Sequence, residues 1–138
     1  MNATTTIPYG MTATVDLPYE RAVERTREAL GAEGFGVLTE VDIRATLRKK
    51  LDVESRPYTI LGACNPPLAH QAFNAEPNIG LLLPCNVVVY ATDDERRSVV
   101  ATIDPEVSLG RVGNAARAPL AADNKARLQR VLDTVSAG

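Results

Sequence analysis

The chain has few of the residues that mark the more specialised classes of protein. Among its 138 residues there are no tryptophans, two cysteines and one histidine, and aromatic residues make up only 4%. Two cysteines are too few for a disulfide-based scaffold, and in a reducing compartment a cysteine usually acts as a small buried hydrophobic residue. We therefore predict that Cys64 and Cys85 are not bridged to each other.

An excess of positive charge and long apolar runs are also missing. Fifteen Lys and Arg face seventeen Asp and Glu, for a net charge of −2. A nucleic-acid-binding domain would show a basic stripe or stacking aromatics, so nucleic acid is not an expected partner. No stretch approaches the roughly 18 apolar residues of a membrane span, and the first residues lack the basic and apolar regions of a signal peptide. We predict a cytoplasmic protein that does not bind membranes.

The length of the chain matches the common size of one domain. A domain of this size should bury roughly two-thirds of the surface of its unfolded chain, which is enough for one self-sufficient core. No internal repeat or low-complexity tract divides the sequence. We therefore predict a single domain over residues 1–138, with a core at about 5–104 and a C-terminal helix at about 120–136.

Hydrophobic patterns predict about five strands and four helices. Strands are expected over 4–15, 37–41, 58–64, 87–90 and 98–103, and the last two form a hairpin across the charged turn 92–97. Helices are expected after Pro18, Asp42 and Asn65 and over 120–135, where apolar residues recur every three or four positions. Asp16 is placed to cap the first helix or to favour its dipole.

Three further segments carry specific expectations. Residues 87–90 are apolar throughout, which is typical of a strand buried on both faces. Residues 79–84 are too apolar for an exposed loop, so they either pack under a neighbouring element or form an interface. Residues 105–119 contain two glycines and no hydrophobic period, so they are predicted to form a loop.

Both cysteines and the histidine fall within residues 64–85. Cys64 ends a predicted strand and precedes a helix that Asn65 caps and Pro66 begins. The dipole and free N–H groups of that helix would favour a reactive thiolate, whereas the alternative is a buried thiol that fills space. Cys85 opens the strand expected to be buried on both faces, so we predict a core role for it.

His70 falls away from the centre of the apolar face of its helix, so it is expected near solvent or facing a cleft. It could act as a base for Cys64, but six residues across a turn do not secure hydrogen-bond reach, and a surface histidine without a role is the alternative. Cys64, His70 and Cys85 match no paired zinc spacing, so neither a metal nor a cofactor is predicted. The candidate ligand-binding residues are Cys64, Asn65 and His70.

The second helix has a basic face over Arg44 to Lys50, opposite Ile43, Leu47 and Leu51. Such a face could hold an anion or dock an acidic partner. An ordinary solvated face is the alternative, because basic helix surfaces are common without a specific partner.

Three stretches together resemble the bacterial and archaeal family called domain of unknown function 302. They are GFGVLTEVD at 34–42, LGACNP at 61–66 and GLLLPCNVVVY at 80–90, within a likeness over roughly Tyr9 to Ile103. One departure is Ala91, where the family pattern has an acidic residue, so no role is assigned to a charge there.

The resemblance implies an α+β fold of two layers. It consists of a mostly antiparallel curved sheet of about five strands with helices packed on one face, similar to the TATA-binding-protein-like arrangement and commonly met as a homodimer. It implies no reaction, substrate or cofactor.

Three functional hypotheses are consistent with these patterns. The leading one is a homodimeric, non-catalytic domain that binds a small ligand or a partner in a pocket near Cys64, Asn65 and His70. The alternative is a thiol-dependent enzyme or sulfur carrier that uses Cys64. The third is an assembly module that docks an acidic partner through the basic helix. An enzyme is thus the less favoured class.

Overall fold

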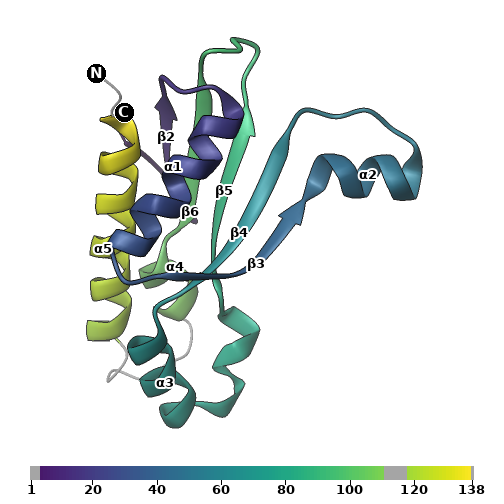
Figure 1. Cartoon of the computed structure of the whole chain (residues 1–138). Coiled ribbons are helices and arrows are strands. Elements are labelled where there is room, and N and C mark those ends of the chain that lie inside the picture. Colours follow the sequence, from purple (N-terminus) through teal and green to yellow (C-terminus); the bar gives the residue numbers. More distant parts are fainter. Residues whose placement is uncertain (1–3, 111–117, 138) are drawn as a thin grey trace.

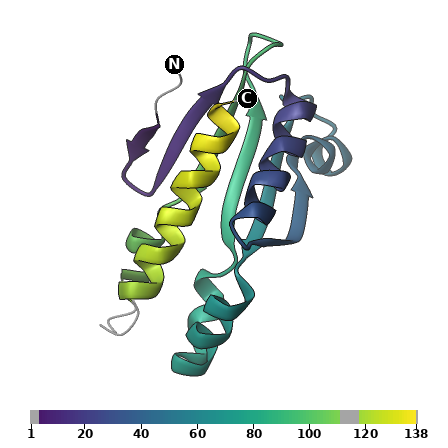
Figure 2. The same cartoon turned by 60° about the vertical axis from the view of Figure 1, so that its left-hand side comes forward.

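The computed structural model describes residues 4–110 and 118–137. Within them, six strands form one antiparallel sheet in the order β1-β2-β6-β5-β4-β3. Figures 1 and 2 show α1 and α5 side by side across one face of this curved sheet. The strands are β1 (Thr5–Ile7), β2 (Gly10–Val15), β3 (Gly36–Asp42), β4 (Tyr58–Cys64), β5 (Cys85–Ala91) and β6 (Ser98–Ile103).

The helices lie between and after these strands. They are α1 (Tyr19–Ala32), α2 (Ile43–Leu51), α3 (Pro66–Ala75), the 3₁₀ helix η1 (Pro77–Leu82), α4 (Pro105–Leu109) and α5 (Ala118–Ser136). The predicted α+β class, with an antiparallel curved sheet and helices packed on one face, is confirmed.

The first predicted strand, 4–15, is a hairpin of two strands rather than one. Ile7 pairs with Gly10, and Pro8 and Tyr9 form the turn between them. Proline cannot donate a ladder hydrogen bond, so the strand ends before Pro8. The prediction of about five strands is corrected to six among the described residues, because alternation alone did not show this turn.

The core lies between the sheet and the pair α1 and α5. Side chains alternate along each strand, so Leu61, Val87 and Val100 point to the helices and are fully buried. They pack with Leu30 of α1 and Leu128 of α5. Full burial of one such aliphatic side chain contributes about 1.5–3 kcal/mol, so this layer supplies most of the driving force for folding.

β5 is not buried on both faces, which corrects the expectation for residues 87–90. Cys85, Val87 and Val89 are buried, whereas Val88 and Tyr90 are only partly buried. The physical reason is that the described helices pack on one face of the sheet and leave the other uncovered.

Two local details differ from expectation. Asp16 does not cap α1, because Pro18 occupies the N-cap position, and the Asp16 carboxylate instead lies 3.0 Å from Arg97 Nε. The predicted loop from residue 105 begins with α4, whose cap is Asp104, an acceptor for Glu106 N–H at 2.9 Å. Five residues are too few to show a helical period, and the remainder of that predicted loop at 111–117 lies outside the described residues.

The apolar segment 79–84 divides its side chains between two environments. Ile79 is 1% exposed and packs with Ala72, Leu109 and Ala121 in a second small core, which places this part of the segment under its neighbours. Leu81 is 89% exposed. One 3₁₀ turn therefore anchors the segment on one side and presents an aliphatic side chain on the other.

The helix α2 projects from the β3 edge of the sheet, away from α1 and α5 (Figure 1). Asp42 caps it as expected, accepting from Ala45 N–H at 2.9 Å. No residue of α2 is buried, and Leu51 is 66% exposed. The apolar side of this helix therefore adds nothing to the main core.

Candidate functional site

Strand β4 ends at Cys64, the first of the candidate residues, and α3 starts after Asn65. Asn65 is buried at the N-cap of α3, where its Oδ1 accepts from Leu68 N–H at 3.3 Å, and Pro66 follows as the first helical residue. Because the cap uses the carbonyl oxygen of Asn65, this side chain has a structural function. Cys64 is half-buried at the end of β4.

Gly62 holds the neighbouring strands and Pro84 close to this strand end. A Cβ atom added at Gly62 would collide with Thr39 Oγ1 of β3 and would lie 2.8 Å from Pro84 Cγ. Glycine therefore lets β3, β4 and the start of β5 pack tightly beside the site.

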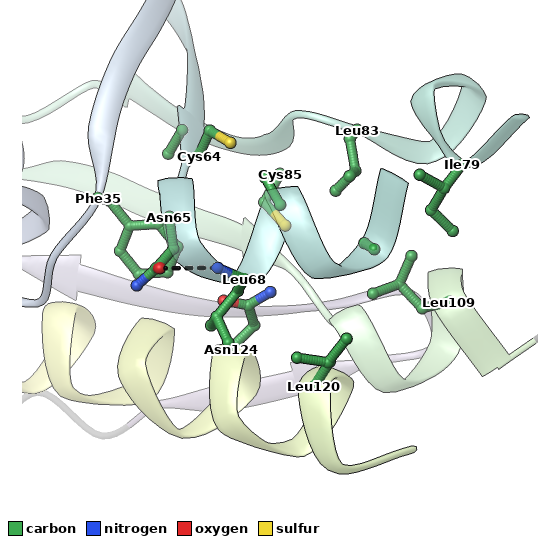
Figure 3. A pocket seen from close by; sticks show the side chains of 13 residues that line it. Phe35, Cys64, Asn65, Leu68, Ile79, Leu83, Cys85, Leu109, Leu120 and Asn124 are labelled. Atoms are coloured by element: carbon green, nitrogen blue, oxygen red, sulfur yellow. Dashed lines mark hydrogen bonds between the residues drawn. The ribbon is translucent and has the colours of Figure 1, made fainter. Parts of the chain in front are cut away.

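A small cavity opens where the end of the sheet meets α3, η1, α4 and α5. Figure 3 shows its lining side chains converging from these elements. The volume that the centre of a water molecule can occupy there is about 20 Å³. The lining residues are Phe35, Ala63, Cys64, Asn65, Leu68, Ala69, Ala72, Ile79, Leu83, Cys85, Leu109, Leu120 and Asn124.

The cavity is electrically neutral, because none of its lining residues carries a charged side chain. Burial raises the pKa of the Cys64 thiol above its usual value, and burial followed by the effect of Cys64 raises the pKa of Cys85 to about 11. Both thiols are therefore protonated near pH 7. This direction is opposite to the lowered pKa that a helix N-terminus was expected to favour at Cys64, and its cause is the loss of solvent around the thiol.

The structure brings Cys64 and Asn65 together in the cavity, but His70 does not line it. His70 is exposed on α3, and its Nε2 lies 3.2 Å from Asn74 Nδ2. Among the residues that the structure describes, no group of three His, Cys, Asp or Glu side chains is placed to hold a metal ion.

Asn124 of α5 is a cavity residue that the sequence reasoning missed. It is 8% exposed, and its Oδ1 is buried without a hydrogen-bond partner among the described residues. A signal for it was present: Asn124 falls between Ala121 and Leu128 at helical spacing, on the face that otherwise carries only apolar side chains. A polar residue at such a position indicates a specific hydrogen-bonding role.

These features define a class of protein: a two-layer α+β domain with one open sheet face and a small neutral cavity at the end of the sheet. The family model described as "Domain of unknown function DUF302" matches residues 11–135. The chain belongs to this family, which confirms the resemblance drawn from its three sequence stretches.

A solved relative has the same fold. It is the crystal structure of an uncharacterized conserved protein DUF302 from Bacillus stearothermophilus, with 31% sequence identity and a TM-score of 0.84 over 94% of this chain and 99% of that chain. A comparison with curated proteins finds no match. Within residues 4–110 and 118–137, no helix is both long and apolar enough to cross a membrane.

Proposed function

We propose that this chain is a single, cytoplasmic, homodimeric domain that binds a small ligand in the cavity between Cys64, Asn65 and Asn124. The observation that supports ligand binding is the cavity itself, which is mostly apolar and has a few polar groups converging in it. Binding sites for small molecules commonly have this composition. Two free cysteines are consistent with a reducing compartment.

The uncovered face of the sheet supports the dimer. Register places two rows of side chains across this face, and none of these side chains is charged. The Tyr58 and Tyr90 rings stack there with centroids 5.3 Å apart. The rows are Tyr58, Tyr90, Val99 and Thr14, and then Ile60, Val88, Ala101 and Thr12.

A second copy of the chain is the partner that fits this face. Two sheets can pack face to face through β-branched and aromatic side chains at about 10 Å separation. In a two-fold dimer each copy would contribute the same uncharged rows, so the surface is complementary to itself. The side chain of Val88 lies in the middle of these rows.

Native mass spectrometry of gently purified protein tests both parts of the proposal. We expect a dimer with a retained small molecule, and a bare monomer would contradict both parts. Val88→Lys should give a monomer, because it places charges in the centre of the interface. Ala122→Lys, at an exposed position of α5, is the matched control and should remain dimeric.

Thiol chemistry at Cys64 is the competing hypothesis, and burial of the thiol weakens it. Alkylation rates measured against pH on Cys64→Ala and Cys85→Ala variants separate the two ideas. On our proposal Cys64, measured in the Cys85→Ala variant, reacts no faster than a free thiol with a pKa of about 8.5. Faster reaction at neutral pH would favour an enzyme or sulfur carrier.

Docking of an acidic partner on α2 is also less well supported. Arg48 pairs with Glu54, and Arg44 Nη2 lies 3.9 Å from the same carboxylate, so part of the basic face is neutralised within the chain. Lys49 and Lys50 are exposed. Reversing both to Glu should leave the dimer and ligand binding unchanged, whereas loss of either would give this helix a direct role.

A further inference from the structure

Asn124 lines the cavity and has a side-chain oxygen that takes no part in the hydrogen bonds of the fold. Its Oδ1 is buried and lacks a hydrogen-bond partner among the described residues. The other cavity asparagine, Asn65, differs because its Oδ1 accepts from Leu68 N–H at 3.3 Å. Figure 3 shows Asn124 extending from α5 toward α3, beside Leu68. One acceptor in the cavity wall is therefore available to a guest.

Burying an acceptor without a donor is unfavourable, so its position needs an explanation. Asn124 lies on the core face of α5, one turn after Ala121 and one turn before Leu128. An aliphatic residue at this position would continue the apolar face of the helix without burying a polar group. A molecule that enters the cavity could supply the missing donor.

The mostly apolar lining of the cavity suits an organic ligand better than a tightly held water molecule. The accessible volume of about 20 Å³ slightly exceeds the roughly 10–15 Å³ that one water requires. An ordered buried water usually makes two to four hydrogen bonds, however. Besides Asn124 Oδ1, the polar side-chain groups of the lining are the amide N–H groups of the two asparagines and the thiols of Cys64 and Cys85, which are weak hydrogen-bonding groups. The other nine lining residues are apolar. A ligand with one hydrogen-bond donor and an otherwise apolar structure matches this lining better.

The lining also selects against charge. No charged side chain lines the cavity, so an ion entering it would lose its hydration without gaining a counter-charge. The apolar side chains of Phe35, Leu68 and Leu120 would instead contact a carbon body. The size of the cavity restricts the buried part of the guest to a few heavy atoms.

We infer that Asn124 determines ligand specificity and that the ligand is a small uncharged molecule with one N–H or O–H donor on an otherwise apolar body. The donor binds Asn124 Oδ1, and the carbon atoms contact the apolar lining. This inference rests on the ligand cavity proposed above and adds the chemical class of the ligand. Asn124 acts through recognition, and no covalent step is involved.

Pyrrole and furan are a matched pair of probes for this inference. The two rings have nearly the same shape, but only pyrrole carries an N–H donor. Each ring is titrated into the full-length protein while the backbone amide signals of Leu68, Ile79 and Asn124 are followed by NMR. We expect both rings to shift these signals and pyrrole to bind about tenfold more tightly, the factor that 1.4 kcal/mol corresponds to.

Asn124→Leu removes the acceptor and keeps a side chain of similar size. In this variant the preference for pyrrole should disappear, with furan bound at least as well as in the wild type. Asn74→Leu, an exposed position on α3 outside the cavity lining, is the control and should keep the preference. The comparison of the two rings on wild-type protein does not depend on how any variant folds.

The outcomes separate the two levels of the proposal. Equal affinity of the wild type for both rings, or an unchanged preference in Asn124→Leu, overturns the role of Asn124 while leaving the cavity as a ligand site. Absence of any shift at the cavity amides with either ring, up to the limit of solubility, overturns the ligand site as well.

Discussion

Arg127 Nη1 of α5 donates a 2.8 Å hydrogen bond to the backbone carbonyl of Glu33, at the end of α1. The Nε of the same guanidinium lies 3.0 Å from Asp123 Oδ2, one turn earlier on α5. Beside this contact, Gly34 has a φ of +85°, a conformation that glycine adopts without strain, and leads the chain into β3. Arg127 therefore ties α5, which carries Asn124, to the connection between α1 and the sheet.

Replacing Arg127 should reduce the stability of the protein. We expect Arg127→Met to lower the free energy of unfolding by about 1–2 kcal/mol, because the Glu33 carbonyl loses a charged donor. Urea denaturation measures the change. Arg130→Met is the control: Arg130 Nε lies 2.9 Å from the Glu33 carboxylate in a more exposed ion pair, which contributes about 0–1 kcal/mol. Equal losses in the two variants would contradict the special role of Arg127.

Gly62→Ala should destabilise the protein by about 1–3 kcal/mol, because overpacking displaces neighbouring atoms. The new Cβ would collide with Thr39 Oγ1 and approach Pro84 Cγ to 2.8 Å. Gly31→Ala is the control, since a Cβ added in α1 meets nothing within 4 Å and should stabilise the helix by about 0.5–1 kcal/mol. Thermal unfolding measures both variants.

Removing the Thr39 hydroxyl should relieve part of the Gly62→Ala defect. The double variant with Thr39→Ala is expected to lose less stability than the sum of the two single variants, because the collision with Oγ1 is gone. A double-mutant cycle of unfolding free energies measures this coupling. Strict additivity would show that Thr39 does not cause the strain.

The stability should fall at alkaline pH through Cys85. Burial raises its pKa to about 11 from an ordinary value of 9.0, so the fold favours the protonated thiol. The contribution is complete below pH 9 and is lost as the pH rises toward 11, with a limit of about 3 kcal/mol for a two-unit shift. From pH 8 to 10.5, we expect the unfolding free energy of the wild type to fall relative to that of Cys85→Ala. A constant difference would show that folding does not raise the pKa of Cys85.

Asp104 and Lys125 form an ion pair that connects α4 to α5. Asp104 is buried, caps α4 and lies 3.0 Å from Lys125 Nζ, whereas the more exposed Glu106 lies 3.3 Å from the same nitrogen. Asp104→Asn keeps an acceptor for the cap but loses the charge, so we expect a loss of about 1–2 kcal/mol. Glu106→Gln should cost less than about 1 kcal/mol. If urea denaturation ranks the two variants in the opposite order, the buried pair is not the stronger contact.

Local patterns predicted much of the fold because neighbouring residues in the chain, such as helix caps and prolines, determine where helices and strands begin and end. Asn65 followed by two prolines identified the start of α3, and Asp42 identified the cap of α2. The same kind of evidence failed where the element was too short for a period, as in α4, or where a turn interrupted an alternating pattern, as at Pro8.

The sequence by itself determined the α+β class, the family and the position of Cys64 and Asn65 at a strand-to-helix junction, because each depends on residues close together in the chain. Only the tertiary structure decided which side chains share the cavity. Packing places Asn124 of α5 in the cavity lining and leaves His70 outside it. Loss of solvent raises the pKa values of both cysteines. These outcomes depend on contacts between distant segments and on the exclusion of water, which spacing along the chain does not encode.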